Sequence, residues 1–381
     1  MTTKLLDPRS GLDGTVLTGA QLQRLWDATM ANRGVRFVLL ALSAVLCAFL
    51  SWKAVDNQLT QTLFGLDPHD SIRRFLAGTQ AKPFAYRVFT PALIYVAQYW
   101  LHIPALAQAA PDFIAQKVPI ICARYGAGQE SSCGNIVSYF VVGWGLFLGF
   151  LLTMFVMAKR LFNGNLLLAA GTVYLSFALV NAIILRGLSH TYDWGTLLFG
   201  ALFLLCLLAE RPILFCLVMV VACFNKETAI LFGAPFFLVN LDRLGPRRTI
   251  ALCGVQLLTF IVIYGGLRLH FAHNSGTWME IHLREQIYLF SEHINLPLLF
   301  GLLTAIVFVF YRFPDKDPTL RAACIILPPW FALYLVGAVA REIRDTFEIL
   351  PLLVLLTMQS LVALVGQGVA SRGARLDVSS E

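Results

Sequence analysis

The chain has 381 residues, of which 58% are hydrophobic and only 13% are charged. Soluble domains carry about 25% charged residues, so this composition excludes an ordinary soluble domain and indicates a polytopic membrane protein. The formal net charge is +7. No basic block or RNA-binding motif accompanies that charge, so we predict no nucleic-acid partner and assign the excess to loops that face the cytoplasm.

Apolar runs follow one another along nearly the whole chain. A complete helical span needs about 20 residues. The runs that reach or approach this length are 35–52, 88–101, 103–121, 136–158, 165–185, 194–209, 212–224, 228–239, 249–267, 295–311, 322–340 and 347–365. Segment 103–121 is the weakest because it contains Asp112, Lys117 and three prolines. We therefore predict an all-α transmembrane bundle of about eleven to twelve segments that embeds the chain in a lipid bilayer.

The runs define one membrane domain, 35–366, with a polar tail at each end. Residues 1–34 lack an apolar core and a small-residue cleavage site, so we expect a cytoplasmic tail before a retained anchor. Residues 367–381 form the second cytoplasmic tail.

This topology places most loop cations in the cytoplasm, as the positive-inside rule requires. The expected location is a bacterial inner (plasma) membrane with the active face in the periplasm. If 103–121 does not cross, every later loop changes side. The inner cations beyond the N-terminal tail are Lys159, Arg160, Arg211, Arg243, Arg247, Arg248, Arg312, Lys316, Arg321, Arg372 and Arg375.

Two of the eight cysteines lie outside the apolar runs. Cys122 and Cys133 bracket a polar loop that the topology places outside, where a disulfide would suit an oxidising periplasm. The alternative is coincidence, because two cysteines at such a spacing need not pair.

The first outer loop carries Asp67 and Asp70, with His69 between them. Two carboxylates this close can share a divalent metal such as Mg²⁺ or Mn²⁺, or divide into a base and a stabilising group. The structural alternative is a turn in which Asp70 caps the following helix. That helix, within 70–78, is amphipathic and is expected to lie along the membrane surface.

Tyr86 and Arg87 precede the second apolar run. A guanidinium at a helix start is unfavourable with respect to the helix dipole. Arg87 therefore needs a negative partner, and the candidates are a bound phosphate, Asp67 or Asp70.

His190, Tyr192 and Asp193 lie between two later runs. Asp193 suits a helix cap, and Tyr192 suits the aromatic belt of a membrane interface. The functional alternative is that this group contacts a polar substrate such as a sugar.

The sequence Asn225-Lys226-Glu227-Thr228 interrupts a stretch of about 27 otherwise apolar residues. Neighbouring side chains on a helix point apart, so Lys226 and Glu227 are each expected to have a separate partner. A simple turn would more often use Gly, Pro or Ser. The pattern therefore favours a functional site over a plain connection.

Arg341 and Arg344 lie between the last two runs and share one helix face, where they can clamp a phosphate. The alternative is a solvated loop with internal ion pairs. Glu348 stands one turn into the last run and needs a buried partner. Six of the seven histidines fall on the outer side without metal-type spacing, so a zinc site has little support.

Together these features resemble the GT-C superfamily of integral-membrane glycosyltransferases. The resemblance rests on the acidic first loop, the surface helix after it, Tyr86-Arg87, the break at Lys226, and the charges between 341 and 348. It implies inverting transfer of a hexosyl or pentosyl unit from a polyprenyl-phosphate-linked donor to a glycan, lipid or protein acceptor on the outer face.

The same resemblance implies roles for individual residues. Asp67 or Asp70 would be the general base, with the choice between them and the use of a metal left open. The donor phosphate would be held by Arg87, Lys226, Arg341 and Arg344. The expected substrate contacts are His69, Tyr86, His190, Tyr192, Asp193 and Glu227.

Two rival functions use similar lipid-linked substrates. A flippase or transporter would place its charges near the bilayer midplane and show internal symmetry, whereas here the charges lie at segment ends and no repeat is evident. A lipid-linked polysaccharide polymerase would draw its cations from two large outer loops.

Overall fold

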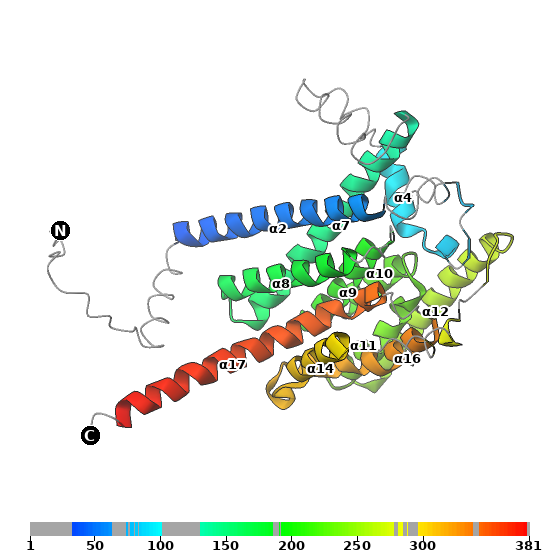
Figure 1. Ribbon diagram of the computed structural model, residues 1–381. Helices are drawn as coiled ribbons and strands as arrows, with labels where there is room; N and C mark the ends of the chain where they lie inside the picture. The colour runs from blue at the N-terminus through cyan, green and yellow to red at the C-terminus, as the bar shows by residue number, and fades with distance from the viewer. Residues whose placement is uncertain are drawn as a thin grey trace. The chain divides into compact units, whose positions relative to one another are not determined.

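A computed structural model describes residues 33–62, 74, 77–79, 81–82, 84–100, 130–185, 190, 192–277, 281–284, 288, 296–337 and 343–378. Within these ranges the chain is helical (Figure 1), and the one β contact there is an isolated bridge between Lys82 and Gly276. This part of the chain confirms the predicted all-α class.

The α-helices are α2 Arg33–Thr62, α4 Phe89–Tyr95, α7 Glu130–Leu161, α8 Leu166–Ile184, α9 Asp193–Leu208, α10 Pro212–Ala222, α11 Gly233–Leu244, α12 Pro246–His270, α14 Leu296–Phe310, α15 Pro318–Ala323, α16 Leu327–Gly337 and α17 Leu350–Val378. Short helices of other types are η1 Phe84–Tyr86, η2 Val96–Trp100, η3 Glu227–Phe232, η4 Phe313–Asp315, η5 Cys324–Ile326 and η6 Ile343–Glu348.

Five described helices are long and apolar enough to cross a membrane, which indicates an integral membrane protein. They are Phe37–Leu59, Asn135–Leu161, Leu166–Ile184, Pro246–His270 and Pro318–Gly337, and three shorter apolar helices accompany them. The predicted total of about eleven to twelve segments stays a prediction, because 103–121 lies outside the described residues.

By internal contacts, residues 43–360 form one compact unit, and 1–42 with 361–381 form another. The described parts of the smaller unit are the first residues of α2, 33–42, and the last residues of α17, 361–378. All of the contacts discussed below lie within 43–360.

Helices α9, α10 and α11 run in alternating directions. The turn after α10 returns to the start of α9, where Asn225 Nδ2 donates to Thr196 Oγ1 at 3.0 Å. The end of α11 reaches the end of α9, where Arg243 Nη1 donates to the Leu207 carbonyl at 3.1 Å. We call the end with Asn225 the site end and the end with Arg243 the far end.

Helix α9 forms the centre of the packing. It is apolar around its whole circumference, as expected for a helix enclosed by others. Trp194, Phe203 and Leu207 are almost fully buried. By contrast, α12 exposes apolar side chains such as Val255, Leu258 and Val262, and an exposed apolar face of this length suits lipid chains.

The stretch 101–129 is flanked on both sides by residues at the site end. Before it, Arg87 stacks on Tyr192, and after it, Tyr139 contacts Trp194. These contacts bring Arg87 together with later segments of the chain, whereas the crossing of the membrane by 103–121 stays a prediction.

Candidate functional site

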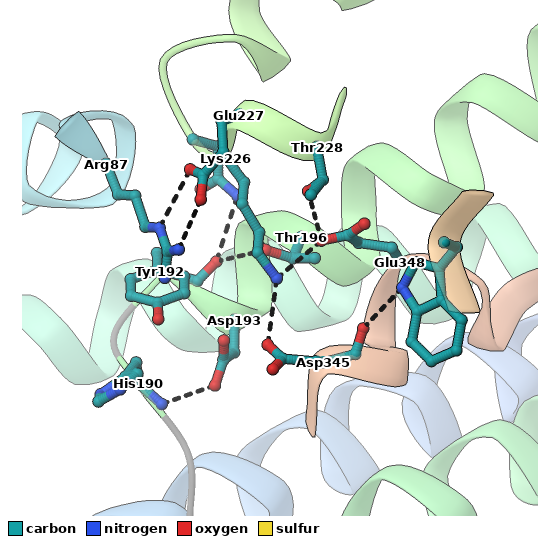
Figure 2. Close-up of polar contacts among 12 residues, drawn as sticks. Arg87, His190, Tyr192, Asp193, Thr196, Lys226, Glu227, Thr228, Asp345 and Glu348 are labelled. Carbon is teal, nitrogen blue, oxygen red and sulfur yellow. Dashed lines mark hydrogen bonds and ion pairs between the residues drawn. The ribbon is translucent and has the colours of Figure 1, made fainter. Parts of the chain in front are cut away.

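The site is built around the break between α10 and η3. Helix α10 ends at Ala222, and Lys226 adopts an extended backbone with φ −158° and ψ 140° before η3 begins at Glu227. The extended residue directs the side chains of Lys226 and Glu227 to different partners (Figure 2). The prediction that each has a separate partner is confirmed.

Lys226 lies between two carboxylates from the segment that precedes α17. Its Nζ is 2.7 Å from Glu348 Oε1 and 3.3 Å from Asp345 Oδ1. Burial alone would lower the pKa of Lys226, but Glu348 and then Asp345 outweigh it and hold that pKa above its ordinary value. Lys226 is therefore a buried ammonium ion, and it is the partner that Glu348 was expected to need.

Arg87 pairs with Glu227. Arg87 Nη2 donates to Glu227 Oε1 at 2.8 Å, and Nε donates to Oε2 at 3.4 Å. Burial would raise the pKa of Glu227, but Arg87 outweighs it and holds that pKa below its ordinary value. The negative partner of Arg87 is thus Glu227, whereas the sequence had suggested a phosphate, Asp67 or Asp70.

Tyr192 covers the Arg87 guanidinium, whose carbon lies 4.4 Å from the ring centroid. This cation–π contact is within the usual range of about 6 Å. The ring of His190 lies 5.2 Å from that of Tyr192 and also contacts Phe84. These aromatic rings hold the guanidinium in a fixed position.

Asp193 is the first residue of α9, and its carboxylate turns back toward the preceding loop. Asp193 Oδ2 accepts a hydrogen bond from the His190 backbone N–H at 2.6 Å. It therefore fixes the turn that precedes α9.

Tyr86, another predicted substrate contact, is buried beside α12. Its ring lies 5.7 Å from that of Tyr264 in an edge-on arrangement. Arg268 lies one turn further along α12, and its guanidinium carbon is 4.7 Å from the centroid of the Tyr264 ring. A third cation thus lies on the Tyr86 side of the Arg87–Glu227 pair.

Two glycines on α9 allow the charged segments to approach. A Cβ atom at Gly200 would lie 2.6 Å from the Glu348 backbone oxygen, and one at Gly195 would collide with the Asn225 side-chain oxygen. We did not identify either glycine from the sequence. The available signal was two glycines within six positions of a helix whose other residues are mostly bulky.

A buried polar cluster that we also missed joins α2, α7 and α9. Trp194 Nε1 donates to Gln58 Oε1 at 2.6 Å, Tyr139 donates to the same oxygen, and Gln58 Nε2 donates to the His190 carbonyl at 3.2 Å. This cluster anchors the end of α2, which leads into the loop of Asp67 and Asp70. A glutamine near the end of the first apolar run was the available signal.

Several predicted site residues are not placed. Asp67, His69, Asp70, Cys122 and Arg341 lie outside the described residues, and Cys133 and Arg344 are described in their backbone only. The base, the disulfide, the two-arginine clamp and the Mg²⁺ or Mn²⁺ ion at Asp67 and Asp70 stay predictions. In the part of the chain that the structure describes, no group of three or more His, Cys, Asp or Glu residues is arranged for a metal.

No family model matches this chain, and no curated protein or solved structure matches it either. The GT-C resemblance therefore depends on the residues and their placement alone.

Proposed function

We propose that this chain is an integral-membrane glycosyltransferase. It would move a hexosyl or pentosyl unit from a polyprenyl-phosphate-linked donor to a glycan, lipid or protein acceptor on the periplasmic side of a bacterial inner membrane. The proposal rests on one observation: two buried cations, Arg87 and Lys226, lie together at the site end and retain hydrogen-bonding capacity.

That capacity follows from the number of donors. A lysine ammonium has three N–H groups, and Lys226 directs two of them at Glu348 and Asp345. A guanidinium has five N–H groups, and Arg87 uses its Nε and Nη2 atoms on Glu227. One N–H of Lys226 and the Nη1 group of Arg87 have no partner among the described residues. Such donors suit the oxygens of a phosphate leaving group.

The charge balance adds a requirement. The ion pairs of the site join three carboxylates, Glu227, Asp345 and Glu348, to two cations, Arg87 and Lys226, and a third cation, Arg268, lies nearby on the Tyr86 side. A bound phosphate would add further negative charge, so the proposal needs more cations at this site. Arg341 and Arg344 fill that role in the proposal, because Arg344 directly precedes Asp345 in the sequence.

The proposed reaction is a single displacement. Asp67 or Asp70 removes the proton from an acceptor hydroxyl, whose oxygen attacks the anomeric carbon of the donor. The bond between that carbon and the phosphate oxygen breaks, and the electron pair leaves with the lipid phosphate. The cations stabilise the charge that develops on this leaving group, and attack from the opposite side inverts the anomeric centre.

The test is transfer from a polyprenyl-phosphate hexose or pentose by the purified chain in lipid nanodiscs. Asp67→Asn or Asp70→Asn should abolish turnover at normal membrane level and folding. Lys226→Ala should raise KM for the donor about ten-fold or more, since a hydrogen bond to a charged group contributes about 1.5–3 kcal/mol.

The matched control is Lys159→Ala, which removes a cation at the end of α7 and should leave donor dependence unchanged. Full activity in both aspartate variants would refute the assignment of the base. Unchanged donor dependence in Lys226→Ala would leave Lys226 with a structural role alone.

A further inference from the structure

One oxygen of the Glu348 carboxylate is buried without a hydrogen-bond partner. Glu348 is only 4% exposed. Its Oε1 atom accepts from Lys226 Nζ at 2.7 Å and from Thr228 Oγ1 at 2.5 Å, whereas Oε2 has no partner within the described ranges. The two oxygens of one carboxylate are thus used unequally.

The unpartnered oxygen is held in a fixed position. Lys226 and Thr228 hold the carboxylate from the η3 side (Figure 2). The Glu348 backbone lies directly against Gly200 of α9, where no larger residue fits. A carboxylate restrained at its head group and at its backbone presents Oε2 in a constant direction.

An unpartnered charged oxygen in a buried place is unfavourable. Oε2 belongs to a carboxylate that forms an ion pair with Lys226, and a carboxylate oxygen accepts hydrogen bonds. A buried acceptor without a donor loses the hydration of the unfolded state and gains nothing in return. A donor from outside the protein removes this cost, so Oε2 marks a ligand-binding position.

The chemistry of the surroundings restricts the ligand. Glu348 and Asp345 both contact the same Lys226 ammonium, so a further anion at Oε2 would be repelled by these two carboxylates. Lys226, the cation assigned to the donor phosphate, lies against the other oxygen of the same carboxylate. The group joined to that phosphate would therefore lie next to Glu348.

We propose that Glu348 Oε2 accepts a hydrogen bond from a hydroxyl group of the donor's glycosyl unit, which makes Glu348 a sugar-binding residue. This inference rests on the proposed function, because it takes the ligand to be the sugar of a lipid-linked donor.

The test compares wild type with Glu348→Gln in the transfer assay, using the intact donor and its mono-deoxy analogues. Glutamine keeps the size and an oxygen for Lys226 and Thr228, but it replaces the acceptor at Oε2 with an N–H donor. KM for the intact donor should rise about ten-fold or more. At one hydroxyl position, the deoxy analogue should have a KM with wild type that is higher than that of the intact donor by a similar factor. With Glu348→Gln, the same analogue should have the same KM as the intact donor. Glu210→Gln, which neutralises an exposed carboxylate at the far end, is the control and should behave as wild type.

An unchanged KM in Glu348→Gln would overturn the proposal. The proposal would also fail if every deoxy analogue raised KM by the same factor in both proteins. Oε2 would then be solvated by water. If the variant fails to fold, the wild-type measurements decide. If removal of each hydroxyl in turn leaves the wild-type KM unchanged, the hydroxyl contact is excluded.

If wild type transfers no sugar, the proposed function fails separately. Methyl glycosides are then tested for thermal stabilisation of the two proteins. Stabilisation of wild type but not of Glu348→Gln supports sugar binding at Oε2, and equal or absent stabilisation refutes it.

Discussion

At the residue scale, the site consists of buried ion pairs whose partners are distant in sequence. Lys226 and Asp345 are 119 positions apart, and Arg87 and Glu227 are 140 apart. The sequence showed that Lys226 and Glu227 each needed a partner, because an unpaired charge in an apolar stretch is costly. It did not identify those partners, since pairing across such distances depends on how the helices pack.

The Arg87–Glu227 pair predicts a pH-dependent stability. Arg87 holds the pKa of Glu227 below its ordinary value of 4.5. The pair therefore stabilises the fold fully above pH 4.5, and its contribution is lost as the pH falls through the lower folded-state pKa. Glu227→Gln should destabilise the protein by about 3 kcal/mol at neutral pH, because it leaves a buried guanidinium without its counter-charge.

The measurement is the thermal unfolding midpoint in detergent between pH 8 and pH 3, a range that extends below the ordinary pKa of a glutamate. The gap between wild type and Glu227→Gln should narrow towards the acid end. Both proteins contain Asp345 and Glu348, so the difference between the two curves reports the Glu227 substitution. Parallel curves over the whole range would contradict the assignment.

At the element scale, the decisive feature is how closely η6 and the α10–η3 turn approach α9. The sequence predicted two short apolar runs with a polar break, and the structure contains α10, the break at Lys226, and η3 with α11. The hydropathy pattern located the break correctly because charged residues interrupt the apolar stretch there. Hydropathy did not reveal that Gly195 and Gly200 allow the close approach, since a glycine in an apolar helix has no distinctive hydropathy.

Gly200→Ala should therefore destabilise the site. The added methyl group would lie 2.6 Å from the Glu348 backbone oxygen, so η6 or α9 must move. We expect a loss of about 1–3 kcal/mol, typical of overpacking a close contact. Donor KM should rise as well, because Glu348 and its partner Lys226 would shift together.

Gly145→Ala is the matched control, because a Cβ atom there meets nothing within 4 Å. Alanine is favoured over glycine in a helix by about 1 kcal/mol, so this variant should be neutral or slightly more stable. Both variants replace glycine with alanine in a helix. Gly200→Ala should lower the thermal unfolding midpoint, whereas Gly145→Ala should leave it unchanged or raise it slightly. A neutral Gly200→Ala would show that the contact can relax at no cost.

At the scale of the whole molecule, the two ends of the larger unit differ in charge. The far end carries Arg211 in the connection between α9 and α10, Arg243 in the last turn of α11 and Arg247 in the first turn of α12. The site end carries buried cations that are paired with carboxylates. The sequence predicted an excess of cations on the cytoplasmic side, and which end of the bundle faces the cytoplasm stays a prediction.

The sequence did not reveal the buried cluster of Gln58, Tyr139 and Trp194. In the sequence, aromatic and amide residues near the ends of apolar runs cannot be distinguished from residues that lie in the belt at a membrane interface. Which of them turn inward is decided by the packing of α2, α7 and α9. Among the described residues, the charged groups of the site, such as Lys226 and Glu348, lie at breaks or ends of helices, a placement unlike the midplane coupling site of a transporter.

Orientation is the last prediction, and α12 allows a direct test. Its 25 residues extend about 37 Å at 1.5 Å per residue, which is enough to cross a hydrocarbon core of about 30 Å. Arg247 and His273 are exposed at opposite ends of this helix. A membrane-impermeant maleimide applied to intact cells should label His273→Cys, whereas Arg247→Cys should react only after permeabilisation. Wild type supplies the blank for the native cysteines. The reverse pattern would place the site end in the cytoplasm, and it would exclude a periplasmic acceptor for the proposed transfer.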